Sequence, residues 1–262
     1  MTYLIAAVLG VIQGLTEFLP VSSTAHLLIA GRLLGHEDPA FTVMIQLGSV
    51  LAIMWLYRAK IAAVVRGLRS DSDARRFVLT IIVGCLPALA AGALLADFVQ
   101  AVLYESLRII AVVFILGGVV MLLIERLRPA PDVFDAERTP VSRAFGIGVC
   151  QMLALVPGVS RSGATIIGAM LMRLDRPAAA EFSFFLAMPL LTAAFAYQFV
   201  DVQSTLAAGR ALEIAIGFVA AFISAAVVIR PFLGFVRRAG FAPFAWYRIV
   251  AGATILALLP AG

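Results

Sequence analysis

Charged residues are scarce in this sequence. Asp, Glu, Lys and Arg make up 13% of its 262 residues and hydrophobic residues 63%, whereas a soluble domain carries about 25% charged residues. This composition excludes an ordinary soluble domain and indicates a polytopic membrane protein. The formal net charge of +5 comes largely from basic residues in short segments between apolar stretches. Because that distribution reports orientation in a membrane, no nucleic-acid partner is expected.

Cysteine is almost absent as well. The two cysteines, Cys85 and Cys150, lie in apolar runs and lack the CxxC spacing of a redox or metal motif. We therefore interpret both as small hydrophobic residues. A separate cleavable signal is not expected, because the first apolar segment contains Glu17 and continues into the rest of the fold.

Long apolar runs, in contrast, are abundant. Six are long enough to cross a bilayer, whose core needs about 20 residues: Phe41–Tyr57, Phe77–Ala96, Leu107–Ile124, Ala179–Val200, Leu212–Ile229 and Phe241–Pro260. Two other stretches, Tyr3–Leu34 and Ala144–Arg173, each hold two short apolar halves separated by a proline-containing break. We predict an all-α polytopic membrane protein with six spanning helices and two re-entrant helix–loop–helix hairpins, whose breaks are buried in protein or line a cavity.

Basic residues predict the orientation of these segments. They concentrate in the loops at 58–76, 125–143 and 230–240, which the positive-inside rule places in the cytoplasm. Both termini then lie outside, the first hairpin enters from outside and the second from inside. A hairpin followed by three spans thus occurs twice in opposite orientations, as in inverted-repeat membrane proteins. We expect one integral membrane domain over residues 1–262, with repeat 1 at about 1–124 and repeat 2 at about 144–262.

The first hairpin contains polar groups that are costly in a membrane. Gln13 and Glu17 are four residues apart and share a helical face. Interhelical hydrogen bonding explains Gln13 as well as a functional role does. A carboxylate in hydrocarbon must neutralise or find a cation, so Glu17 is expected to bind a metal or transfer a proton.

Three hydroxyls follow Pro20 at the first break, those of Ser22, Ser23 and Thr24. At least one is expected to cap the second half-helix. His26 lies three residues after Ser23. A lone core histidine is more often structural, but beside a hydroxyl and a carboxylate it has the chemistry to activate a nucleophile.

The second break surrounds an arginine with small residues, over Pro157–Gly163. Arg161 lies at a predicted helix N-terminus, where backbone N–H groups and a bidentate guanidinium favour phosphate oxygens. Ser160, Ser162 and Thr165 can add donors or caps. The alternative is an arginine that extends to the membrane surface, which the apolar halves on both sides make less attractive.

Two long motifs carry a resemblance to a known family. E-F-L-P-V-S-S-T-A-H at Glu17–His26 and P-G-V-S-R-S-G-A-T at Pro157–Thr165 resemble the two signatures of the bacterial undecaprenyl-diphosphate phosphatases, the bacitracin-resistance family. The resemblance covers essentially the whole chain, including E-F-S-F-F-L-A-M-P at Glu181–Pro189. It implies an enzyme of the bacterial plasma (inner) membrane, with its site facing outside, that removes the terminal phosphate of undecaprenyl diphosphate. This reaction recycles the carrier lipid for cell-wall synthesis.

The resemblance also implies residue roles and a cofactor. Ser23 matches the proposed nucleophile, His26 its base or acid, and Arg161 the phosphate clamp, while Glu17 is implied as a catalytic residue and as a ligand of Mg²⁺ or Ca²⁺. The residues implied in substrate binding are Gln13, Ser22, Ser160, Ser162 and Thr165. Some members have Glu in place of Gln13, so this chain has one carboxylate, not two, at these positions, and Glu181 is a candidate to compensate.

Other functions fit part of the pattern. A transporter of the lipid carrier would share the inverted repeats, but ion transport does not need the Ser23–His26 pair together with Arg161. Intramembrane proteolysis would leave Arg161 without a role.

For the hydrolase, the sequence leaves open whether Ser23 forms a phosphoserine or positions water. The expected partners are the polyprenyl diphosphate lipid and the membrane, and a homodimer stays open.

Overall fold

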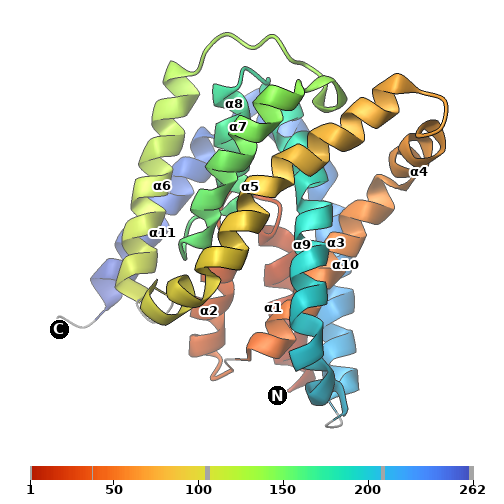
Figure 1. Cartoon of the computed structure of the whole chain (residues 1–262). Coiled ribbons are helices and arrows are strands. Elements are labelled where there is room, and N and C mark those ends of the chain that lie inside the picture. Colours follow the sequence, from red (N-terminus) through yellow and green to blue (C-terminus); the bar gives the residue numbers. More distant parts are fainter. Residues whose placement is uncertain (1, 37, 104–106, 208–209, 260–262) are drawn as a thin grey trace.

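The described part of the chain is built from helices. The computed structural model describes residues 2–36, 38–103, 107–207 and 210–259 (Figure 1). Within them, β-structure is confined to one isolated bridge between Val133 and Leu174, which confirms the all-α class. The α-helices are α1 Tyr3–Thr16, α2 Ser23–Leu33, α3 Pro39–Leu56, α4 Arg58–Gly67, α5 Ser72–Leu103, α6 Leu107–Leu127, α7 Val141–Gln151, α8 Arg161–Leu171, α9 Arg176–Ala207, α10 Ala211–Ala239 and α11 Ala242–Leu258, with 3₁₀ turns η1 Ala136–Arg138 and η2 Met152–Leu155.

Five helices are long and apolar enough to cross a membrane over described residues. They are α3, α5, α6, α9 and α10, and they match five of the six predicted spans. The sixth prediction, Phe241–Pro260, corresponds to α11, a 17-residue apolar helix; Pro260 lies outside the described residues. The protein is a multi-pass membrane protein.

The lipid-facing surface explains why these helices are apolar on more than one side. Large hydrophobic side chains stay exposed along them, for example Leu79, Ile82 and Leu86 on α5. In water such surface would favour association, whereas in a bilayer it is solvated by acyl chains. The predicted loop 58–76 contains the short helix α4, which carries three basic residues, Arg58, Lys60 and Arg66.

Both polar stretches form a helix, a break and a second helix. In the first stretch α1 ends at Thr16 and α2 begins at Ser23; in the second, α7 and η2 end at Leu155 and α8 begins at Arg161. Figure 1 shows α1 and α2 toward the end of the molecule that holds both termini, and α7 and α8 toward the opposite end, beside the α6–α7 connection. The two breaks therefore approach each other in the interior.

Each of these units packs closely on a long helix. Helix α1 packs on α10, where a Cβ at Gly10 would come within 2.2 Å of the Gly217 carbonyl oxygen. Helix α7 packs on α5, where a Cβ at Gly148 would lie 2.4 Å from the Gly84 carbonyl oxygen. Glycine is required at both contacts because the backbones approach too closely for a side chain.

The contact between α6 and α11 is reciprocal. A Cβ at Gly118 would lie 2.6 Å from the Ala245 carbonyl oxygen, and one at Gly252 would lie 2.6 Å from the Ala111 carbonyl oxygen. Reciprocal contacts of this kind are what a local two-fold relation between two helices produces.

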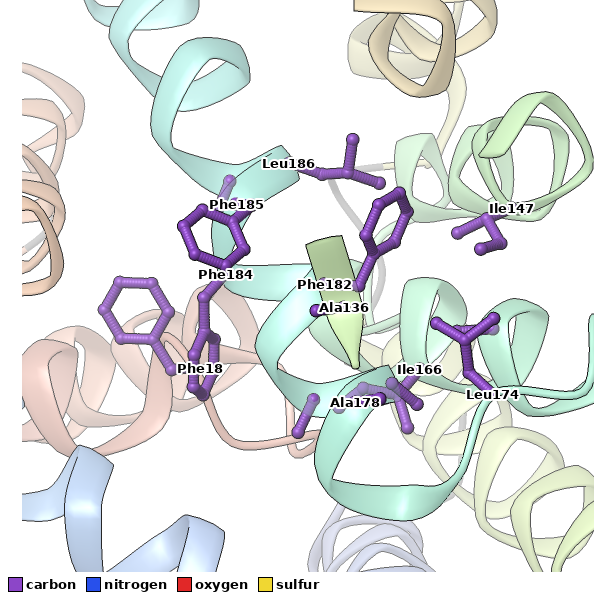
Figure 2. Packing of buried hydrophobic residues seen from close by; sticks show 14 of the residues in the cluster. Phe18, Ala136, Ile147, Ile166, Leu174, Ala178, Phe182, Phe184, Phe185 and Leu186 are labelled. Carbon is purple, nitrogen blue, oxygen red and sulfur yellow. The ribbon is translucent and has the colours of Figure 1, made fainter. Parts of the chain in front are cut away.

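The main apolar core surrounds the N-terminal half of α9 (Figure 2). Phe182, Phe184 and Leu186 are fully buried there. Phe18, the neighbour of Glu17, packs edge-to-face on Phe184 with ring centroids 5.4 Å apart. Because this contact fixes the residue after Glu17, the core holds the first break in place.

Candidate active site

The carboxylate of Glu17 is the point at which the two polar clusters meet. Glu17 directly follows α1 and is 5% exposed. Its Oε2 accepts hydrogen bonds from Gln13 Nε2 at 2.8 Å and from Ser23 Oγ at 2.6 Å. Its Oε1 accepts one from Arg161 Nη2 at 2.9 Å. One acid thus joins residues of α1, α2 and α8, and the predicted convergence of the two breaks is confirmed.

The backbone of the first break turns Ser23 back toward Glu17. Ser22 has φ 65° and ψ 94°, a left-handed conformation that is uncommon for any residue but glycine. Ser22 is the N-cap residue of α2 but makes no side-chain cap. The expectation that a hydroxyl of this run caps α2 is therefore wrong at that position. The Ser23 hydroxyl instead binds the carboxylate, which is a stronger acceptor than a neutral group.

The second break presents Arg161 from the first turn of α8. Ser160 caps this helix by accepting a bond from the Gly163 N–H at 3.1 Å, as expected. Ser162 Oγ donates to the Leu19 carbonyl at 2.7 Å and so links the two breaks. The Arg161 side chain is 12% exposed and ion-paired with Glu17. The alternative of an arginine extending to the surface is thereby excluded.

A small cavity of about 70 Å³ lies against these groups. Five of the predicted site residues line it: Glu17, Ser22, Ser23, Ser160 and Arg161. The other lining residues are Thr24, Gln46, Ala154, Val159 and Leu191. A guanidinium, hydroxyls and a carboxylate around one small space suit the oxygens of a phosphoryl group.

A larger cavity of about 460 Å³ shares Thr24 and Gln46 with the first. Much of its lining is apolar, with Leu9, Leu27, Leu28, Phe41 and Ile45, and it also includes His36 and Asp38 between α2 and α3. A polar compartment therefore adjoins an apolar one, an arrangement that suits a ligand with a charged head and a hydrocarbon tail.

His26 lies beside this site, but hydrogen-bonds to other groups. Its Nδ1 is 2.8 Å from the Ser22 carbonyl oxygen and its Nε2 is 2.5 Å from the Tyr247 hydroxyl oxygen. The Tyr247 ring also stacks on the imidazole at 5.6 Å. In the neutral ring, Nδ1 then carries the proton that faces Ser22, and Nε2 accepts from Tyr247. The structure thus pairs Ser23 with Glu17, and His26 with the backbone of the first break.

Thr165 is fully buried behind Arg161. Its hydroxyl bridges to the Gln151 Oε1 at 3.1 Å and the Arg161 carbonyl at 2.8 Å. It does not line the small cavity, and neither do Gln13 and Ser162, which support Glu17 and Leu19 respectively.

Comparison with known proteins identifies the family of this chain. Residues 6–254 match the family model described as bacitracin resistance protein BacA. A protein of Cereibacter sphaeroides named undecaprenyl-diphosphatase is 49% identical over 263 residues, which cover 100% of this chain and 98% of the relative. Undecaprenyl-diphosphatase 1 of Agrobacterium fabrum is 50% identical over 260 residues, covering 98% and 97%. The chain belongs to the bacitracin resistance protein family.

Membership of the bacitracin resistance family raises the question of a divalent cation. In the described residues, no cluster of three or more His, Cys, Asp or Glu side chains could hold a metal ion. Glu17 is the carboxylate on the small cavity, and Glu181 lies instead 3.7 Å from Lys60, so Glu181 adds no second acid there. The Glu17 carboxylate and the Gln13 amide beside it are the oxygen-bearing groups that would hold Mg²⁺ jointly with substrate phosphates.

This family member has two site residues that our sequence interpretation missed. Gln46 is a polar residue within an otherwise apolar span, and it lines both cavities. The cost of polar groups in a membrane, which singled out Glu17, was a signal for Gln46 too. Tyr247 follows His26 by 221 residues, and no local pattern predicts such a contact.

An ion pair lies at the end of the larger cavity, outside the spans. Arg210 Nη1 is 2.5 Å from Asp38 Oδ2, and Asp38 Oδ1 caps α3 by accepting from the Phe41 N–H. Burial would raise the pKa of Asp38, but the Phe41 bond and the Arg210 guanidinium outweigh it and lower that pKa. The carboxylate is therefore held in its ionised form.

Proposed function

We propose that this protein hydrolyses undecaprenyl diphosphate to undecaprenyl phosphate and inorganic phosphate. The observation that carries the proposal is the chain of contacts from Ser23 through Glu17 to Arg161, on a polar cavity that adjoins an apolar one. The names of the whole-length relatives support it. The reaction would regenerate the carrier lipid for cell-wall synthesis and give resistance to bacitracin.

The proposal includes a topology and a location. We propose that α3, α5, α6, α9, α10 and α11 span the bacterial plasma (inner) membrane, and that the two broken units are re-entrant hairpins of repeats at about 1–124 and 144–262. Support comes from the placement of both termini at one end and of α4 with the α6–α7 connection at the other (Figure 1). The basic segments predicted to be cytoplasmic are those at the second end.

The same arrangement supports a site that faces outside. The larger cavity is lined by His36 and Asp38, which connect α2 to α3 at the end that holds the termini. A lipid headgroup at the outer face would reach Ser23 through Thr24 and Gln46, which both cavities share. The polyprenyl tail would then lie along the apolar lining of the larger cavity.

Arg161 is the proposed phosphate clamp. Its guanidinium and the N-terminus of α8 favour phosphate oxygens. A diphosphate in the small cavity competes with Glu17 for the Arg161 donors, because both are anionic acceptors at the same fork. Binding thereby releases Glu17 Oε1 from its ion pair, while Oε2 continues to accept the hydrogen bond from the Ser23 hydroxyl.

Ser23 is the proposed nucleophile. Its Oγ attacks the terminal phosphorus, Glu17 Oε2 takes the hydroxyl proton, and the bond from phosphorus to the bridging oxygen breaks to release undecaprenyl phosphate. Water then hydrolyses the phosphoserine and yields inorganic phosphate. A divalent cation held by Glu17, Gln13 Oε1 and the diphosphate would neutralise charge on the leaving phosphate. His26 keeps the strained Ser22 backbone in place through its Nδ1 contact.

Phosphate release by the purified full-length protein tests this function. Undecaprenyl diphosphate in detergent is the substrate, assayed with Mg²⁺ and with chelator. Arg161→Ala and Ser23→Ala are each expected to lower kcat by at least about 100-fold, since a clamp and a nucleophile act in the transition state. Acid quenching during turnover should trap phosphate on Ser23. The exposed Arg237 gives the matched control Arg237→Ala, which should keep wild-type rate.

Three results would count against the proposal. Lipid transfer across vesicles without phosphate release would favour a transporter. A Ser23→Ala variant with substantial rate would leave water, not Ser23, as the nucleophile. Full activity in Arg161→Ala would remove the clamp.

A further inference from the structure

A second buried arginine lies between the two breaks. Arg248, on α11, is 2% exposed. It forms no ion pair with another described residue, so its charge is compensated in another way. An uncompensated buried cation is costly. Its contacts therefore indicate what the charge does in this fold.

Arg248 donates hydrogen bonds to backbone carbonyls of three separate segments. Its Nη1 reaches the Pro20 carbonyl at 3.3 Å, and its Nη2 reaches the Gly158 carbonyl at 3.0 Å. The carbonyls of Val113 and Phe114 on α6 also accept, at 3.4 and 3.5 Å. The guanidinium carbon lies 5.0 Å from the centre of the Phe114 ring. Carbonyl dipoles and one aromatic face thus compensate the charge.

Two of these acceptors belong to the breaks themselves. Pro20 lies midway between Glu17 and Ser23, and Gly158 precedes Arg161 by three residues. Neither carbonyl lies in a helix, so neither has a partner in a helical ladder. One guanidinium therefore satisfies both breaks and fixes the separation of their carbonyls.

The neighbouring glycine is required by this placement. A Cβ at Gly117 would lie 2.3 Å from Arg248 Nη2 and 2.9 Å from its Cζ. The guanidinium therefore fills the space that any side chain at position 117 would need. This gives a way to displace Arg248 without removing it.

We propose that Arg248 is a positioning residue that sets the distance between the Ser23–Glu17 pair and the Arg161 clamp. It acts through the Pro20 and Gly158 carbonyls and does not touch the substrate. A planar fork with five donors can serve carbonyls in several directions, whereas a lysine ammonium cannot span them. The proposal rests on the proposed hydrolase activity, although the effect of Arg248 on the backbone of the two breaks can be measured separately.

The test uses Arg248→Lys, Arg248→Met and Gly117→Ala in the full-length protein. Misplacement by about 1 Å can cost about 100-fold in rate, so kcat should fall by about tenfold in Arg248→Lys and about 100-fold in Arg248→Met, with KM for undecaprenyl diphosphate changed less than about threefold. Gly117→Ala, which keeps the arginine, should resemble Arg248→Lys. The matched controls are Arg237→Lys, at an exposed position, and Gly234→Ala, where a Cβ meets open space; both should keep wild-type kcat.

Hydrogen–deuterium exchange provides the readout that is independent of activity. Amides of residues 17–23 and of 156–163 should lose protection together in the Arg248 and Gly117 variants, and not in the controls. Wild-type kcat in Arg248→Lys and Gly117→Ala, or loss of protection in one break alone, would overturn the proposal. If Arg248→Met does not fold, Arg248→Lys and Gly117→Ala still test the proposal. If the wild type releases no phosphate, the hydrolase proposal fails, while the exchange result still tests whether Arg248 holds the two breaks together.

Discussion

At the scale of single residues, the site depends on which partner each polar group finds. Glu17 has three donors around its two oxygens, from Gln13, Ser23 and Arg161. Sequence alone identified all four of these residues because each is polar in an apolar setting. It paired Ser23 with His26 from a spacing of three residues, whereas the chain reversal at Ser22 turns the hydroxyl toward the carboxylate. A positive φ at a serine could not be predicted from the pattern.

Gln13 offers a test of the cation at this scale. Replacement by Glu adds a second carboxylate beside Glu17, so Gln13→Glu should lower the half-saturating Mg²⁺ concentration for phosphate release by about tenfold, as expected when ligand charge rises. Without cation the same variant should unfold at a lower temperature, because two like charges then adjoin. Gln13→Ala is the control and should not tighten the Mg²⁺ dependence. An unchanged Mg²⁺ titration for Gln13→Glu would argue against a cation held at this position.

Gln46 provides a second test, because it lines both cavities. If its amide contacts the diphosphate, Gln46→Glu should raise KM by at least about tenfold through repulsion between a carboxylate and an anionic substrate. Gln46→Ala should raise KM less, by the factor that corresponds to the loss of one hydrogen bond to a charged group. Steady-state kinetics with undecaprenyl diphosphate measures both, and equal KM values in the two variants and the wild type would exclude a contact.

At the scale of elements, hydropathy predicted the long helices and proline predicted the breaks. The spans were recoverable because a membrane requires about 20 apolar residues in a row. Helix α4 lies inside a predicted loop and was not predicted, because ten residues with several basic side chains resemble any cytoplasmic connection. Interior prolines Pro87, Pro189 and Pro231 leave α5, α9 and α10 continuous as helices, so proline marks a break in this chain only where polar groups accompany it.

The start of α3 allows a prediction of pH dependence. Asp38 is held by the Phe41 N–H and by Arg210, and its pKa is lowered by them. A folded-state pKa below the unfolded value of about 3.9 stabilises the fold above that pH, and the stabilisation is lost as pH falls through the folded value. Asp38→Asn should therefore lower the melting temperature at pH 7, and the difference from wild type should shrink as the pH falls below about 4.

Asp38→Ala separates the cap from the charge. Asn can still accept from the Phe41 N–H, whereas Ala cannot, so Ala should cost about 1 kcal/mol more at every pH. Thermal unfolding in detergent at several pH values measures both variants. A difference between Asn and wild type that persists unchanged into acid would show that the ion pair contributes nothing.

At the scale of the whole molecule, the charge asymmetry of the sequence predicted how the two halves are arranged, but it did not predict how their helices pack. Basic loops predicted which segments share a side. That α1 packs on α10, α7 on α5, and α6 on α11 depends on close backbone contacts at glycines such as Gly10, Gly148 and Gly252. A sequence shows those glycines without showing their partners, so the interior meeting of the breaks was an inference from topology.

Thiol labelling of intact cells tests the proposed orientation. Leu33 is the last residue of α2, which lies toward the end with the termini, and Phe134 belongs to the α6–α7 connection; both are well exposed. A membrane-impermeant maleimide should label Leu33→Cys in intact cells and Phe134→Cys only in inverted vesicles. The unmodified chain, whose Cys85 and Cys150 lie within apolar helices, is the control. Labelling of both sites from the same side would contradict the topology.

The ion pair between Glu17 and Arg161 joins residues 144 positions apart, and it has a consequence for how such a protein can be divided. Cutting the chain in the α6–α7 connection leaves one fragment with the acid and the alcohol and another with the guanidinium. Neither fragment would then hold the complete proposed site, and the non-covalent contacts between the two halves would have to reassemble it. Activity from two co-expressed halves is therefore an expected outcome of this architecture.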